Sequence, residues 1–178
     1  LVMAPADEAE CRRMLQTAYD WEGPAMVRYP RGSGPGTSLA EELETLPIGK
    51  GEIRRKGKRV ALLAFGSMLT PALQAGAALG ATVANMRFVK PLDGELILEL
   101  AQDHELLVTL EENVVAGGAG AAVNEFAAAQ GLSARLFNLG LPDRFIEQAA
   151  PEAQLADCGL DAAGIEASVR RVMQSAAS

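Results

Sequence analysis

Short apolar runs alternate with segments of helical apolar spacing between residues 60 and 139. The runs at residues 60–64, 81–84 and 106–110 each end near Gly, Pro or Asn, and a fourth run at 134–139 closes the series. Continuous apolar strands that alternate with helices are typical of a parallel sheet covered on both faces. The pattern therefore predicts an α/β domain of roughly a hundred residues, with the loops that follow its strands at one end of the sheet.

Capping residues mark the expected helix boundaries. Thr70 before Pro71 predicts one helix start, because a hydroxyl cap and a proline in the first turn are both favoured there. Asp93 predicts the cap of a second helix, and Asp161 the cap of a last one with an apolar stripe. Further helices are expected at 120–129, 144–148 and 151–157, and a solvated two-stranded hairpin over 51–59.

The first part of the chain reads as strand, helix and strand over residues 1–29. Asp7 and Glu10 have the spacing of a capping box at the start of this helix. Residues 30–47 are rich in Gly, Ser, Pro and Glu, which indicates a linker, with a short acidic helical turn expected near 39–46. Because an apolar run begins at Leu1 without a lead-in, we expect the sequence to be a fragment of a longer polypeptide.

The amino-acid composition limits the kind of core, partner and cellular location that the chain can have. Of the 178 residues, 49% are hydrophobic but only 4% are aromatic, so the core must consist mainly of Ala, Val and Leu. The net charge of −7 argues against nucleic acid or an anionic membrane as a partner. Cys11 and Cys158 predict two reduced thiols rather than a disulfide framework. Without a membrane-length apolar run or a leader pattern, a cytoplasmic location is expected.

Two features near residue 115 could carry chemistry. The Gly-rich loop at residues 117–120 resembles half of a dinucleotide fingerprint, but Val123 occupies the third glycine position. The favoured interpretation is that these glycines let a helix start close to the sheet. Glu111 and Glu112 follow a predicted strand and could transfer protons, although a role for one of them in bracing the glycine loop is favoured.

Three other polar residues, one histidine and two arginines, are further candidates for a functional site. His104 is the only histidine and is expected at the opposite end of the sheet in a structural role. Arg28 and Arg31 flank Tyr29 and Pro30 at the end of a strand, where a guanidinium can hold a phosphate or carboxylate through two hydrogen bonds. An ion pair at a domain interface explains the same spacing, and the residues alone leave the two readings equal.

Six motifs in series resemble the 1-deoxy-D-xylulose-5-phosphate synthase family of transketolase-like enzymes. They are MAPADE (3–8), VRYPRG (27–32), MRFVKPLD (86–93), EEN with GGAG (111–120), NLGLPD (138–143) and GLDAAG (159–164). The resemblance covers nearly the whole chain. It implies that residues 1–35 end a pyrimidine-binding domain, 36–47 form a linker, and 48–178 form a transketolase C-terminal-like domain with a mostly parallel sheet flanked by helices.

The resemblance also implies a function. The family uses thiamine diphosphate and Mg²⁺ to join pyruvate to glyceraldehyde 3-phosphate with release of CO₂, for isoprenoid and thiamine biosynthesis, and it acts as a homodimer. The family's catalytic, cofactor-binding and metal-binding residues lie upstream of Leu1, so none is assigned here and the fragment alone is expected to be inactive. Arg31 resembles the anchor for the phosphate of the aldehyde substrate, whereas Arg28 is expected to be structural.

Two alternatives stay open. The chain could come from another transketolase-type enzyme, such as the β component of a 2-oxo acid dehydrogenase. It could also be a stand-alone ligand-binding or oligomerisation module that uses the loop at residues 117–120.

Overall fold

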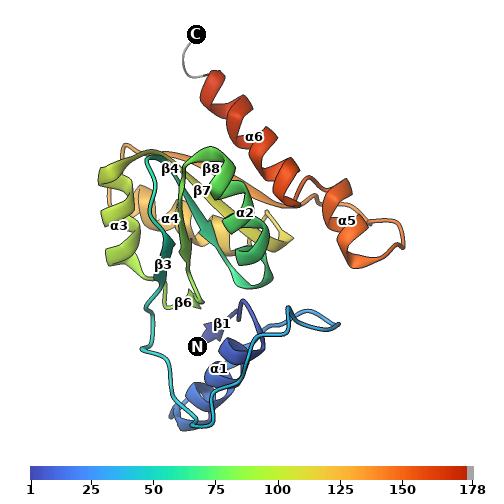
Figure 1. Cartoon of the computed structure of the whole chain (residues 1–178). Coiled ribbons are helices and arrows are strands. Elements are labelled where there is room, and N and C mark those ends of the chain that lie inside the picture. Colours follow the sequence, from blue (N-terminus) through green and yellow to red (C-terminus); the bar gives the residue numbers. More distant parts are fainter. Residues whose placement is uncertain (176–178) are drawn as a thin grey trace.

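The computed structural model describes residues 1–175, which form one five-stranded and one three-stranded sheet with helices packed on them (Figure 1). The larger sheet has the strand order β3-β5-β4-β7-β8. These strands are β3 (Glu52–Arg55), β4 (Arg59–Ala64), β5 (Thr82–Asn85), β7 (His104–Val114) and β8 (Arg135–Leu141). All neighbours pair in parallel except β3, which runs antiparallel along β5 at one edge. The mostly parallel α/β sheet is thus confirmed.

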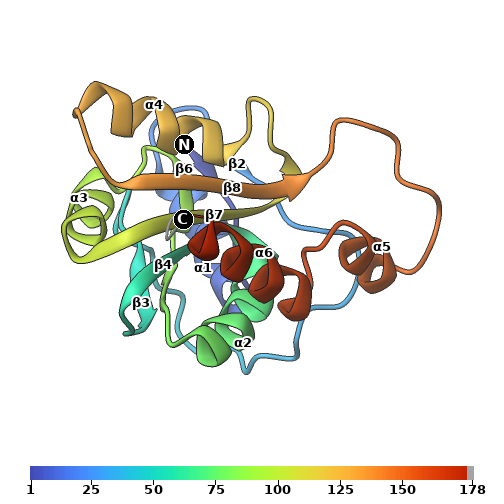
Figure 2. The ribbon, with the colours of Figure 1, turned by 90° about the horizontal axis from the view of Figure 1, so that it is seen from above.

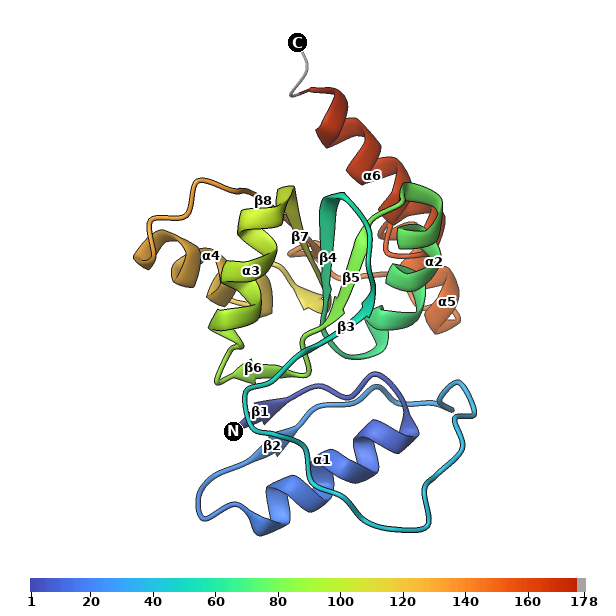
Figure 3. The same cartoon turned by 60° about the vertical axis from the view of Figure 1, so that its left-hand side comes forward.

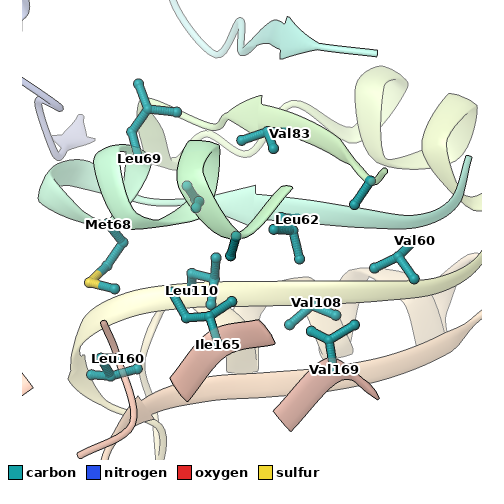
Figure 4. Close-up of a cluster of buried hydrophobic side chains, with 14 of the residues drawn as sticks. Val60, Leu62, Met68, Leu69, Val83, Val108, Leu110, Leu160, Ile165 and Val169 are labelled. Carbon is teal, nitrogen blue, oxygen red and sulfur yellow. The ribbon is translucent and has the colours of Figure 1, made fainter. Parts of the chain in front are cut away.

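Helices cover both faces of this sheet (Figure 2). On one face lie α3 (Gly94–Asp103) and α4 (Ala119–Ala129), and on the other α2 (Leu69–Leu79) and α6 (Ala162–Gln174). Successive residues of β4 point to opposite faces, so that Leu62 packs in the cluster with α2 and α6, and Leu63 in the cluster with α3 and α4. Figure 4 shows the first of these clusters, where Ile165 and Val169 of α6 lie over Val108 and Leu110 of β7.

Most predicted helix boundaries are confirmed. The Asp93 carboxylate accepts a hydrogen bond from the Leu96 amide at the start of α3, and Asp161 does the same for Gly164 at the start of α6. Gly80 ends α2 in the left-handed conformation, with φ of 65°. A short helix, α5 (Pro151–Asp157), precedes α6. Within residues 1–175, no helix combines the length and apolarity that crossing a bilayer requires.

Four local predictions were wrong. The helix α2 begins before Thr70, because a 3₁₀ turn at Gly66–Met68 leads directly into it, and Thr70 therefore caps nothing. The segment 51–59 is not a hairpin, since β3 pairs with β5 rather than with β4. Residues 144–148 and 39–46 contain bends but no helix.

The smaller sheet joins distant parts of the chain. Its strands are β1 (Val2–Met3), β2 (Met26–Val27) and β6 (Phe88–Lys90), in the order β2-β1-β6, with α1 (Glu8–Asp20) packed on it (Figure 3). The predicted strand–helix–strand unit over residues 1–29 is confirmed, but β6 was not expected. Phe88 of β6 is fully buried together with Met3, Met14 and Leu46. The core of the N-terminal part therefore includes a residue from the C-terminal part.

Candidate functional site

The Gly-rich loop surrounds a buried carboxylate of the chain itself. Glu111, at the carboxyl end of β7, is 3% exposed, and its two oxygens accept hydrogen bonds from the amides of Ala119 and Gly120, each at 2.8 Å. The amides at a helix N-terminus are the groups that would bind a phosphate. Because Glu111 occupies them, the geometry favours the bracing role over a dinucleotide site.

The glycines of this loop are required by close packing. A Cβ atom on Gly118 would overlap the Glu111 carboxylate. A Cβ atom on Gly120 would lie 2.5 Å from Asn138 Nδ2 and 2.6 Å from Thr109 Oγ1, and these two atoms hydrogen-bond to each other. The helix α4 can therefore begin against the sheet only with small residues here.

Replacing Gly120 with alanine is expected to destabilise the chain by about 1–3 kcal/mol, the usual cost of overpacking a closely packed core. Chemical denaturation monitored by circular dichroism measures the effect. Ala121→Ser, at a partly exposed position of the same helical turn, serves as the control and should change the stability by less than about 0.5 kcal/mol. Equal stability of Gly120→Ala and the unsubstituted chain would contradict the packing argument.

The N-terminal part docks onto the end of the larger sheet where its parallel strands terminate. The Ala4 amide donates to the Arg87 carbonyl at 2.9 Å, and Arg28 Nη2 donates to the Glu112 carbonyl at 2.6 Å. Ser67 Oγ in turn donates to the Glu112 carboxylate. In open α/β sheets this end commonly binds ligands, but here segments of the same chain lie against it. Arg28 thus joins the N-terminal part to the larger sheet, as expected for a structural residue.

A buried ion pair links the two parts at a second point, and the sequence did not reveal it. Glu10 of α1 is 7% exposed and accepts hydrogen bonds from Ala6 N at 2.8 Å, Asn85 Nδ2 at 2.9 Å and Arg87 Nε at 2.7 Å. Arg87 also pairs with Glu52 of β3 at 2.5 Å. The capping-box spacing explained Glu10 locally, although only Asp7 caps the helix by accepting from the Glu10 amide. Nothing local indicates a partner so far away in sequence.

A cavity of about 490 Å³ lies between the two parts. We call it the junction cleft. Its walls are the segment that leads into α1 and the N-terminal half of α1, the loop residues 29–30 and 32–35, Leu39, Ser67 of the 3₁₀ turn and Thr70 of α2. Cys11 of α1 lies in one wall, and partial burial raises the pKa of its thiol. The cleft is the best candidate for a binding site in the described residues.

Arg31 lies in the loop whose neighbouring residues line the junction cleft, but Arg31 itself does not line it. Its side chain is exposed, and it forms no salt bridge with any carboxylate among residues 1–175. In this it differs from Arg87, whose guanidinium is paired twice. The Arg31 charge is thus available to an anion.

His104 lies away from the cleft, at the amino end of β7. Its Nδ1 is 2.9 Å from the Leu100 carbonyl and its Nε2 is 2.7 Å from Thr82 Oγ1. The ring therefore bridges α3 and β5, as a structural histidine does. In the described part of the chain, no three His, Cys, Asp or Glu side chains lie close enough to hold a metal ion.

Residues 49–165 match the family described as "Transketolase, C-terminal domain", and the chain belongs to this family. Its fold is shared by "Split gene transketolase, inactive beta4 tetramer", which is 32% identical, with a TM-score of 0.86 over 96% of this chain and 56% of that chain. A transketolase from Campylobacter jejuni, 14% identical with a TM-score of 0.67, shares the fold over 96% of this chain and 26% of that one.

Curated relatives of this chain point to one enzyme within the wider transketolase group. The chain is 62% identical over 169 residues to a protein of Nitrosomonas europaea and 61% identical over 171 residues to one of Stutzerimonas stutzeri, both named 1-deoxy-D-xylulose-5-phosphate synthase. These alignments cover 95% and 96% of this chain, but only 28% and 27% of the relatives. The resemblance noted in the six motifs is therefore confirmed, and the chain spans little more than a quarter of the length of these relatives.

Proposed function

We propose that this chain is the C-terminal part of a thiamine diphosphate-dependent synthase. The full-length enzyme condenses pyruvate with glyceraldehyde 3-phosphate, releases CO₂ and forms 1-deoxy-D-xylulose 5-phosphate, a precursor for isoprenoids and thiamine. The observation that carries the proposal is the 62% identity over 95% of the chain to a relative of this name. Identity at this level, extending through both the N-terminal and C-terminal parts, favours this enzyme over a 2-oxo acid dehydrogenase component.

The cofactors are assigned to the upstream part of the polypeptide. Thiamine diphosphate supplies the carbanion chemistry, and the protein binds and orients it. Among residues 1–175, no group of three His, Cys, Asp or Glu side chains is placed to hold a metal ion, and no Mg²⁺ ligand is assigned to them. The Gly-rich loop does not fit a diphosphate, because Glu111 already accepts from the amides of Ala119 and Gly120. No catalytic step is therefore assigned to residues of this chain.

The division into parts is also a proposal. Residues 1–35 would end the pyrimidine-binding domain, 36–47 would connect it, and 48–178 would form the C-terminal domain, of which the last three residues lie outside the described range. The family match, which begins at residue 49, supports this division. The N-terminal part exposes large apolar side chains, Leu15 by 52%, Met26 by 59% and Tyr29 by 61%. Such exposure supports an upstream partner that covers them.

Arg31 is proposed as the anchor for the phosphate of glyceraldehyde 3-phosphate. Its exposed side chain, which forms no salt bridge within residues 1–175, supports this role, because Arg binds phosphate through two parallel hydrogen bonds. We further propose that the full-length enzyme is a cytoplasmic homodimer.

The decisive experiment is a product assay on two proteins, the full-length enzyme and the chain of residues 1–178 alone. With pyruvate, glyceraldehyde 3-phosphate, thiamine diphosphate and Mg²⁺, the full-length enzyme is expected to form 1-deoxy-D-xylulose 5-phosphate, and the chain alone to form none. The related structure described as an inactive β4 tetramer supports the second expectation. Turnover by the chain alone would overturn the assignment of the cofactor site, and a full-length enzyme that makes no xylulose phosphate would overturn the proposed activity.

A further inference from the structure

The segment that carries Arg31 is fixed by a carboxylate on the first turn of α1. We call residues 29–37 the Arg31 loop. Glu8 Oε1 accepts a hydrogen bond from the Gly36 amide at 2.8 Å, and Glu8 Oε2 accepts one from the Thr37 amide at 3.3 Å. These contacts bridge 28 and 29 positions of sequence. They join α1 to the loop on the carboxyl side of Arg31.

The backbone of the loop is shaped to receive this carboxylate. Gly36 has a φ of 83°, a conformation that side chains disfavour. A Cβ atom on Gly34 would overlap the Glu8 carboxyl group, so the chain approaches Glu8 more closely than other residues allow. The amides of Glu8 itself and of Gly36 hold the pKa of Glu8 below its usual value; desolvation opposes them with a smaller effect, and the Thr37 amide adds the smallest contribution. The carboxylate is thus the form that the loop binds.

Other contacts hold the following segment, but farther from Arg31. Arg12 donates to the carbonyls of Ala40 and Glu41, and Arg13 pairs with Glu44 at 3.4 Å. Of these α1 contacts, only those of Glu8 reach the Arg31 loop itself. Because Arg31 forms no salt bridge in the described chain, the path of the backbone sets the region that its guanidinium can reach.

We propose that Glu8 is a positioning residue, which holds the Arg31 loop in the conformation that binds the phosphate group of the aldehyde substrate. The inference rests on the proposed role of Arg31. Glu8 itself does not contact the phosphate, since two anions would repel each other. Its effect is preorganisation, because a loop already ordered loses less conformational entropy on binding.

The test uses the full-length enzyme with Glu8→Gln, which keeps the shape of the side chain and removes its charge. If the binding-competent fraction of the loop falls to about a fifth, the KM for glyceraldehyde 3-phosphate rises about fivefold. The kcat and the KM for pyruvate are expected to stay within about twofold. Glu44→Gln is the matched control, because it removes an exposed carboxylate that holds the same segment farther from Arg31, and it should leave all three constants unchanged.

A second readout is independent of activity. Hydrogen exchange of the peptide that contains the Gly36 and Thr37 amides is expected to accelerate in Glu8→Gln and not in Glu44→Gln. Exchange and KM that are both unchanged in Glu8→Gln would overturn the positioning role. An equal rise of the KM in Glu44→Gln would also overturn it, because the effect would then come from loosening the segment generally.

The Arg31→Ala variant separates this inference from the proposed function. If Arg31→Ala and Glu8→Gln each raise the KM for the aldehyde and the double variant is no worse than Arg31→Ala, then Glu8 acts through Arg31. If Arg31→Ala raises the KM and Glu8→Gln does not, only the positioning role fails. If Arg31→Ala has no effect, the phosphate role of Arg31 fails and the inference fails with it. Additive effects in the double variant would show that Glu8 acts independently of Arg31 and would overturn the inference.

Discussion

Replacing Glu10 with alanine is expected to destabilise the folded chain by about 3–5 kcal/mol, the cost of removing one partner from a buried ion pair. The substitution leaves the Arg87 guanidinium, whose side chain is 13% exposed, without its partner on α1. It also removes the acceptor for the Ala6 amide and for Asn85 Nδ2. Each of these groups keeps its cost of desolvation and loses its hydrogen bond. Equilibrium unfolding in guanidinium chloride, monitored by circular dichroism, measures the change.

The matched control is Glu105→Ala, which removes the partner of Arg59 in an exposed pair. Glu105 is hydrogen-bonded to Arg59, which lowers the pKa of Glu105, but both side chains are more than half exposed. Water screens such pairs, so a far smaller loss of stability is expected. If the two substitutions destabilise the chain equally, the Glu10–Arg87 pair is not the link between the two parts that the geometry indicates.

Replacing Arg31 with alanine in the full-length enzyme is expected to lower kcat/KM for glyceraldehyde 3-phosphate by up to about a hundredfold. A charge-assisted contact contributes up to about 3 kcal/mol, and about 1.4 kcal/mol corresponds to a factor of ten. The KM for pyruvate should not change, because pyruvate carries no phosphate. Steady-state kinetics with each substrate varied in turn measure both values.

Arg31→Lys is the graded control for this prediction. Lysine keeps the charge but lacks the planar guanidinium that binds two phosphate oxygens at once. Its kcat/KM is expected to lie between those of the alanine variant and the unsubstituted enzyme. Aldehyde kinetics that are unchanged in Arg31→Ala would remove Arg31 from the substrate site.

Local patterns were sufficient for most of the larger sheet. The apolar run from Val60 to Ala64 predicted β4 because it is short and is followed by a turn residue, as in a buried strand. Asp93 and Asp161 capped their helices because capping is decided within one turn. Even the bracing role of a glutamate followed from proximity, since Glu111 precedes the amides it binds by only 8 and 9 residues. Features that depend on residues close together in sequence were therefore predictable.

The errors arose where long-range pairing overrode a local signal. The turn at Lys56 and Gly57 suggested a hairpin, yet β3 gains more from β5, where Ile53 pairs with Ala84 at the sheet edge. Glu10 fits a capping box, yet its carboxylate binds Arg87, 77 positions away. At the candidate site, the sequence indicated Arg31 alone, through the family resemblance of its motif, and its phosphate-binding role stays a prediction. The proposed role of Glu8 depends on its hydrogen bond with the Gly36 amide, 28 positions away in sequence. No periodic pattern in the sequence indicates such a contact.

The strand β6 limits how this protein can be recombined with its relatives. A chimaera joined within residues 36–47 would take β1 and β2 from one parent and β6 from the other, although β6 lies beside β1 in the same sheet. The new parent would also supply Phe88 to a core otherwise formed by Met3, Met14 and Leu46. Exchange of the C-terminal part between relatives therefore requires that β1 and α1 be matched to the incoming β6, even though the family match begins 39 residues before Phe88.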